Sequence, residues 1–225
     1  MPLSPKFLSV KQVPVLFWSA PKALTLRPRA VSVVFLVVGL TLFGLGEALV
    51  LAAALGVSPW TVLAQGITYV TGWSIGWATF VISAAVLLCW VPLRRTPGIG
   101  TILNAVIIAL VLEYALPYLP RFDTFGLQLG LAALGVLTTG FGGALYLIAN
   151  LGPGPRDGLM TGLQEVTGAP LAWVRSGLEI SVVVAGWFLG GSVGVGTVLF
   201  AFGIGPAVAG CMYGLARLFG PGRAG

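Results

Sequence analysis

The chain has 225 residues, of which 57% are hydrophobic and only 8% are charged, with a net charge of +6. A soluble domain of this length needs far more surface charge, so the composition excludes a soluble globular fold and predicts a polytopic membrane protein. The chain contains no His, which excludes His-based acid–base catalysis and His metal sites, and we expect no metal or other cofactor.

The chain begins with a basic segment, residues 1–30, which we expect to be a cytoplasmic tail. The apolar run that follows is too long for the core of a secretory signal, so it is interpreted as a retained first span. The basic residues are sparse and interleaved with apolar ones, so we expect no nucleic-acid partner. They are Lys6, Lys11, Lys22, Arg27 and Arg29.

Six apolar runs are long enough to cross the ~30 Å hydrocarbon core of a bilayer. Two shorter segments, 59–72 and 155–168, each begin with Pro and end with Gly, which are typical limits of a helix. Fourteen helical residues reach only about 21 Å, so these segments are predicted to be re-entrant half-helices. The long runs are at about 31–54, 74–93, 98–119, 127–150, 170–190 and 194–216.

A shift of 96 positions aligns the two halves without a gap, with about a third of positions 39–105 identical. LGVSPW (55–60) falls on LGPGPR (151–156), and GIGT (98–101) falls on GVGT (194–197). Three spans per copy, an odd number, would invert the second copy, which also places Arg94 and Arg95 on the cytoplasmic side. The predicted parts are repeat 1 (31–119), a linker (120–126), repeat 2 (127–216) and a cytoplasmic C-terminal tail (217–225).

The predicted fold is therefore all-α: six transmembrane helices plus two half-helices in an inverted repeat. The segments LGPGPRDGLMTGL, WVRSGLEI and GWFLGGSVGVGTVLFAFGIGP of the second repeat resemble the YczE-type integral membrane proteins of bacteria, within the YczE/YyaS/YitT group. SPWTVLAQG resembles the Pro-Trp-Asp pattern of that group, with Thr61 where Asp is usual. The resemblance implies a multispanning protein of the bacterial cytoplasmic membrane and does not imply a substrate.

The charged pair Arg156–Asp157, at the start of the second half-helix, has two interpretations. Asp157 can complement the positive helix start while Arg156 anchors at the membrane interface. Alternatively the half-helix starts inside the protein, and Arg156, Asp157 and the matching start at Ser58–Thr61 converge on a solute. Paired half-helix N-termini of inverted repeats form transporter sites suited to anionic groups.

Two further acidic groups are expected inside the membrane. Arg175 and Glu179 lie four residues apart on one helix face, either as a structural ion pair or as an ion-coupling pair to which Asp157 could belong. Glu47 lies deep in the first span, either as a buried acid that is neutral or bonded to a hydroxyl or amide of a neighbouring span, or as part of the site. Gln65 and Gln164, one on each half-helix, are candidates to line the same site.

These residues contain no catalytic or metal-ligand constellation, so we expect no enzyme. Two functions remain open. The first is a secondary transporter or exporter of a small solute, and the second is a non-transporting scaffold or accessory protein that assists a partner enzyme. The lipid bilayer is the predicted partner in both, and a homo-oligomer or a partner membrane protein stays possible.

Overall fold

The computed structural model describes residues 13–25 and 27–220, and in these residues all regular structure is helical. Residues 1–12 of the predicted N-terminal tail and 221–225 of the predicted C-terminal tail lie outside the described residues. A short 3-10 turn, Leu116–Tyr118, extends α4. The helices are α1 (Ala30–Ala52), α2 (Pro59–Thr71), α3 (Ile75–Cys89), α4 (Ile99–Ala115), α5 (Phe125–Ala149), α6 (Pro155–Thr167), α7 (Leu171–Phe188) and α8 (Val195–Phe219).

Five of these helices are long and apolar enough to cross a bilayer: α1, α4 with its 3-10 turn, α5, α7 and α8. α3 has 15 residues and reaches about 22 Å, less than the ~30 Å hydrocarbon core. α2 and α3 together pass the same test but meet at a bend of 115°. The prediction of an all-helical, multispanning protein is confirmed, whereas the sixth span stays a prediction.

The short helices α2 and α6 have the limits that the sequence predicts. Each has 13 residues and begins at a Pro, whose missing N–H is not needed in the first turn. Each ends at a glycine in the left-handed conformation, Gly72 with φ 74° and Gly168 with φ 67°. The 96-residue register also holds for the first residues of α3 and α7 and of α4 and α8.

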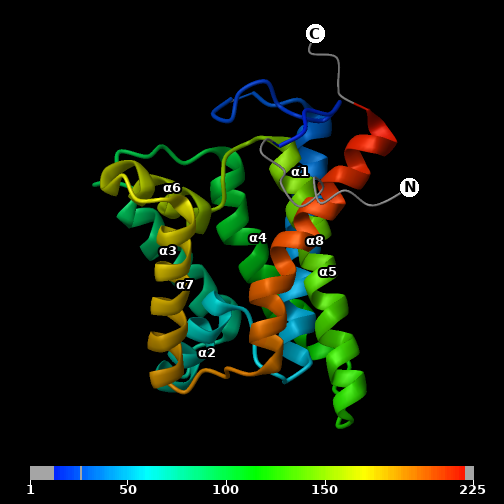
Figure 1. Cartoon of the computed structure of the whole chain (residues 1–225), viewed down its shortest axis with the longest axis vertical. Coiled ribbons are helices and arrows are strands. Elements are labelled where there is room, and N and C mark those ends of the chain that lie inside the picture. The colour runs from blue at the N-terminus through cyan, green and yellow to red at the C-terminus, as the bar shows by residue number, and fades with distance from the viewer. Residues whose placement is uncertain (1–12, 26, 221–225) are drawn as a thin grey trace.

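The helices form two groups that lie side by side in Figure 1. One group contains α1, α4, α5 and α8, and the other contains α2, α3, α6 and α7. α1 runs from the end where α6 lies toward the end where α2 lies, and α5 runs back (Figure 1). α4 and α8, which are equivalent in the 96-residue register, also run in opposite directions (Figure 1).

Four glycines allow α1 and α5 to cross at close range. A Cβ at Gly46 would meet the backbone and side chain of Thr139, and a Cβ at Gly142 would meet the backbone of Phe43. Gly39 and Gly135 have backbone of the other helix just as close. Small residues let membrane helices approach until their backbones touch, so van der Waals contact replaces the missing hydrophobic driving force.

The two halves also exchange contacts through their loops. Gly100 N donates to Leu151 O at 2.7 Å, and Gly196 N donates to Leu55 O at 2.7 Å. These two bonds are equivalent in the 96-residue register, with donor and acceptor taken from opposite halves. α2 likewise packs against α7 of the other half, and α6 packs against α3.

The packing of α7 differs from that of α3, its equivalent in the 96-residue register. α3 packs against α4, whereas α7 scarcely contacts α8, the helix that follows it in the chain. Gly186 is the one buried residue of α7. The second half is therefore more open than the first half along this seam.

The described part of the predicted N-terminal tail packs onto the helices instead of lying free. Trp18 is fully buried and stacks on Phe35 with ring centroids 4.3 Å apart. Ser19 Oγ donates to Ile148 O at 2.6 Å, and Asn150 Nδ2 donates to Ala20 O at 2.8 Å. The bond to Ile148 O satisfies one of the last carbonyls of α5, and the bond from Asn150 ties the residue after α5 to the segment, which therefore covers that end of the bundle.

Candidate functional site: a charged cavity between the two halves

A cavity of about 630 Å³ lies among helices from both halves of the chain. Sites for small molecules have volumes of about 300–1,000 Å³. The starts of α2 and α6 both reach the cavity, and α1, α4, α5, α7 and α8 supply the remaining walls. The polar residues that line it are Glu47, Ser58, Asn104, Tyr146, Arg156, Asp157, Arg175 and Glu179.

The start of α6 presents free backbone N–H groups near this cavity. The first helical bond of α6 is made by Gly158 N, which donates to Gly154 O at 3.0 Å. The amides of Arg156 and Asp157 come before that bond and have no partner within the helix. A helix start of this kind favours negative charge, so both the backbone and Arg156 are suited to an anionic group.

Arg156 is held by an aromatic ring instead of a carboxylate. Its guanidinium carbon lies 5.2 Å from the ring centroid of Trp60, at the start of α2. Within residues 13–25 and 27–220, no carboxylate lies within ion-pair distance of Arg156 and no hydrogen bond to its side chain is present. The cation–π contact fixes the plane of the guanidinium and leaves its N–H donors open to a ligand.

Asp157 shares its carboxylate between the protein and the cavity. Its Oδ2 accepts a hydrogen bond from the Tyr146 hydroxyl of α5 at 2.8 Å. The Asp157 side chain is exposed because it borders the cavity. This bond joins the start of α6 to α5.

Glu47 is the most deeply buried charged residue of the site, with 2% of its surface exposed. Its Oε2 lies 2.6 Å from Ser58 Oγ and 2.8 Å from Thr61 Oγ1, and both hydroxyls can donate to it. Its Oε1 is buried and has no partner among the described residues. Buried polar atoms normally have a partner, so this oxygen is an acceptor available to a hydrogen-bond donor. Gly143, the equivalent of Glu47 in the 96-residue register, also lines the cavity.

The Ser58 side chain does not cap α2, although Ser58 occupies the residue before its first turn. Its hydroxyl bonds Glu47 and lies 2.9 Å from Thr61 Oγ1. Thr61 is buried behind Glu47 and does not line the cavity itself. The start of α2 is therefore tied to α1 through one carboxylate.

Arg175 and Glu179 form the ion pair that their spacing predicts. Arg175 Nε lies 2.9 Å from Glu179 Oε1, and the side chains are 50% and 23% exposed. Both residues line the cavity from α7. Their charges compensate each other, so the pair adds polarity to the wall without adding net charge.

The two glutamines among the predicted site residues lie outside the cavity. Gln65 accepts a hydrogen bond from Ser192 N at 3.0 Å and links α2 to the loop before α8. Gln164 is half-buried on α6. The predicted residues that do share the cavity are Glu47, Ser58, Arg156, Asp157, Arg175 and Glu179.

Two important residues of the cavity were not among the predicted ones, Trp60 and Tyr146. The repeat contained a signal for Trp60, because LGVSPW aligned with LGPGPR places Trp60 on Arg156. Tyr146 carried no comparable signal, since it lies in an apolar stretch of α5 and falls on Val50.

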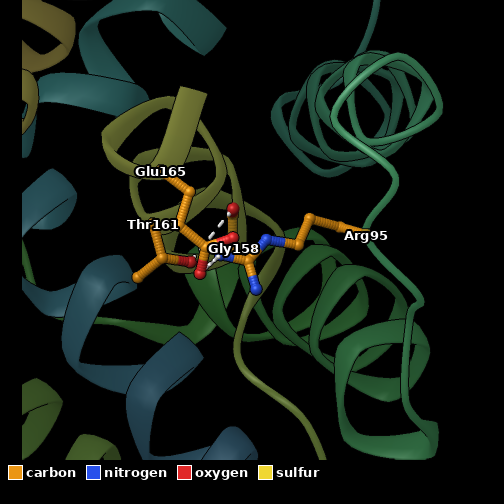
Figure 2. A network of polar contacts seen from close by, with 4 residues as sticks. All are labelled: Arg95, Gly158, Thr161 and Glu165. Carbon is orange, nitrogen blue, oxygen red and sulfur yellow. Dashed lines mark hydrogen bonds and ion pairs between the residues drawn. The ribbon is translucent and has the colours of Figure 1, made fainter. Parts of the chain in front are cut away.

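Contacts with the loop after α3 hold α6 in place. Trp90 Nε1 donates to Pro155 O at 3.0 Å, and the indole of Trp90 occupies the space that a side chain at Gly158 would need. Arg95 reaches from the loop to Glu165 near the end of α6, with Nη2 and Oε1 2.5 Å apart (Figure 2). Thr161 Oγ1 lies beside this pair and donates to Gly158 O at 3.2 Å (Figure 2). These contacts set the direction in which the start of α6 faces the cavity.

The long apolar helices define the class of this protein as an all-helical integral membrane protein, and the cavity between them is lined by both charged and apolar side chains. The chain belongs to the family described as "Family of unknown function (DUF6198)", which matches residues 30–213. This span covers nearly every helix of the fold and all of the cavity except Val13.

Two relatives agree with this assignment. An uncharacterized protein of Haemophilus influenzae is 43% identical over 209 residues, which cover 93% of this chain and 95% of the relative. The uncharacterized membrane protein YczE of Bacillus subtilis is 34% identical over 169 residues, covering 74% of this chain and 79% of the relative. The predicted resemblance to YczE-type proteins is thereby confirmed. No solved structure matches the chain significantly.

Proposed function

We propose that this protein is a secondary transporter of a small solute and that the charged cavity is its solute site. The observation that carries the proposal is Arg156, a half-buried cation in a cavity inside a membrane protein, with no carboxylate partner in the described chain. A charge inside the membrane is costly, so it is retained where it has a function. The open guanidinium next to a helix start is suited to an anionic group of the solute.

The proposal includes an inverted repeat, in which two oppositely oriented copies enclose the site. The opposite directions of α1 and α5 support it, as do those of α4 and α8 (Figure 1). The reciprocal bonds from Gly100 to Leu151 and from Gly196 to Leu55 support it as well. Transport would then proceed as rocking of one half against the other around the cavity, as in other transporters built from inverted repeats.

The proposed topology has six spans, with α3 as the sixth and α2 and α6 as the two half-helices, and both termini in the cytoplasm. α1 begins and α8 ends at the same end of the molecule, which an even number of spans requires (Figure 1). Arg94 and Arg95 follow α3 in the loop that contacts α6 at this end. The excess of basic residues favours the cytoplasmic side of the inner membrane of a bacterium.

A second candidate function is a scaffold or accessory protein that assists a partner in the membrane. The feature that favours it is α7, which has one buried residue and scarcely contacts α8. A helix exposed along its length could dock a partner membrane protein or a second copy. This function needs no solute cavity, so the charged cavity of about 630 Å³ favours the transporter.

Flux in proteoliposomes tests the proposal. The full-length protein is reconstituted, vesicles are loaded with a defined mixture of amino acids, organic acids and phosphate esters, and release is followed by mass spectrometry. We expect at least one compound to leave faster than from protein-free vesicles, and Arg156→Gln to reduce that rate at least tenfold, about the loss of one charge-assisted contact.

Arg217→Gln is the matched control. Arg217 also stacks on an aromatic ring, with its guanidinium carbon 5.2 Å from the ring centroid of Tyr213, but it lies in the last turn of α8 and outside the cavity. We expect R217Q to transport like the wild type. Equal release from protein-containing and protein-free vesicles for every compound would overturn the transporter proposal and favour the accessory role.

A further inference from the structure

We infer that the cavity binds a zwitterion with an apolar body, whose ammonium group lies at Glu47 and whose anionic group lies at Arg156. The inference rests on the proposed function in one respect, namely that the cavity is the solute site. It goes further because it names the class of ligand and assigns one residue to each charge of that ligand.

The position of the ligand's ammonium group is inferred from the unpaired oxygen of Glu47. Ser58 and Thr61 hold Oε2, so the carboxylate cannot turn away, and Oε1 stays without a donor in the described chain. A water-excluded carboxylate oxygen is costly unless a donor meets it. A primary ammonium supplies both the donor and the compensating charge.

The position of the ligand's anionic group is inferred from Arg156 and the start of α6. Trp60 holds the face of the guanidinium, so its planar N–H edge remains for a carboxylate or phosphate. The first amides of α6 lie beside it. A neutral solute would leave these donors unused.

The balance of charge around the cavity disfavours a simple anion. Arg175 and Glu179 compensate each other, which leaves Arg156 as the single cation against Glu47 and Asp157. A simple anion at Arg156 would meet uncompensated carboxylates, whereas a zwitterion satisfies both signs.

The position of the apolar part of the ligand is inferred from the face of α8 that lines the cavity. The side chains of Phe200, Ile204, Val208 and Met212 recur every four residues, so they share one face of the helix, and all four line the cavity. Small residues between them, Ala201, Gly205 and Ala209, leave room beside that face. The ligand therefore has charged groups at the helix starts and an apolar body against α8.

This chemistry has two possible sources, because α7 and α8 scarcely touch. The zwitterion could be an apolar amino acid from solution or a zwitterionic phospholipid, such as phosphatidylethanolamine, from the bilayer. Both carry an ammonium, an anionic group and an apolar part. The test therefore uses one matched pair of probes for each source.

The experiment measures the thermal unfolding midpoint of the purified full-length protein across probe concentrations. One pair is L-phenylalanine and 3-phenylpropionate, which lacks the ammonium. The other pair is dihexanoyl phosphatidylethanolamine and dihexanoyl phosphatidylglycerol, which also lacks it. We expect the zwitterion of one pair to raise the midpoint at a concentration about tenfold lower than its anionic analogue. The pair that shows this preference identifies the source.

Two variants assign the ends of the ligand. Glu47→Gln keeps an oxygen for Ser58 and Thr61 but removes the charge, so we expect the preferred zwitterion and its analogue to become equal. Arg156→Gln should weaken both members of the pair. The comparison of probes on the wild type needs no variant, so the inference stays testable if either substitution prevents folding.

The inference is overturned if neither zwitterion acts at a lower concentration than its anionic analogue. Stabilisation by 3-phenylpropionate that requires Arg156 would overturn the zwitterion while leaving an anion transporter in place. A preference for the zwitterion together with no flux in proteoliposomes would uphold the ligand and overturn transport. The two proposals therefore fail separately.

Discussion

The guanidinium of Arg156 lies over the indole of Trp60, 5.2 Å from the ring centroid, and the two residues occupy equivalent positions of the 96-residue repeat. The site proposed for the solute therefore lies where two half-helix starts face each other. One start supplies the aromatic face and the other supplies the charge.

The first prediction concerns the ring beneath Arg156. Trp60→Phe keeps an aromatic face, whereas Trp60→Leu removes it, with a loss of about 0.5–2 kcal/mol of cation–π energy. We expect W60L to lower solute flux or ligand stabilisation clearly more than W60F. Trp173→Leu, at an exposed position outside the cavity, is the control. Equal effects of W60F and W60L would show that only the volume of the ring matters.

The second prediction concerns the hydroxyls around Glu47. Ser58→Ala removes a hydrogen bond to a buried carboxylate, which contributes about 1.5–3 kcal/mol. We expect a lower unfolding midpoint for this variant, measured on the purified protein.

The control for this prediction is another buried serine. Ser32 Oγ is buried and has no partner among the described residues, so Ser32→Ala removes a polar atom that makes no bond. We expect S32A to be neutral or stabilising. If S58A and S32A unfold at the same temperature, the contact with Glu47 does not stabilise the fold.

The third prediction concerns the crossing of α1 and α5. Gly46→Ala and Gly142→Ala place a methyl group against the backbone of the opposite helix, which costs about 1–3 kcal/mol by overpacking or forces the helices apart. Gly130→Ala on α5 meets open space and improves helix propensity by up to about 1 kcal/mol. We expect G46A and G142A to have a lower thermal unfolding midpoint than the wild type, and G130A to have a higher one. Equal stability of all three would contradict the close crossing.

The fourth prediction concerns access of water to the cavity. Gly205 lines the cavity from α8, and a side chain there meets open space, so Gly205→Cys can be introduced without overlap. In a background with Cys89 and Cys211 replaced by Ser, we expect a charged thiol reagent to label G205C in membranes. The preferred zwitterion should slow the labelling.

Gly210→Cys on the same helix is the matched control for labelling. Gly210 also meets open space but does not line the cavity. We expect labelling of G210C to be unaffected by the zwitterion. Equal protection of both cysteines would mean that the ligand acts on the whole helix and does not occupy the cavity.

Local features of the sequence determined the elements. Hydropathy predicts the long helices, while Pro59, Gly72, Pro155 and Gly168 set the limits of the short ones within a residue. Pro fits the first turn of a helix, and Gly readily takes the left-handed conformation that ends one. The pair Arg175–Glu179 was predictable for the same reason, since one helical turn fixes its geometry. The repeat was visible because it is a property of residue order alone.

Only the tertiary structure decided which polar residues share a cavity. Gln65 and Gln164 lie on the same half-helices as Ser58 and Arg156, yet they lie outside it. Which face of a helix meets a cavity depends on how the helices pack, and here α2 and α6 pack against α7 and α3.

The tertiary structure also decided which residues contact the charged side chains. Glu47 meets Ser58 and Thr61 across the turn between two helices, and Trp60 meets Arg156 across the two halves. Residue order supplies the chemical groups, whereas contacts between distant segments decide which donor and which acceptor remain open for a ligand.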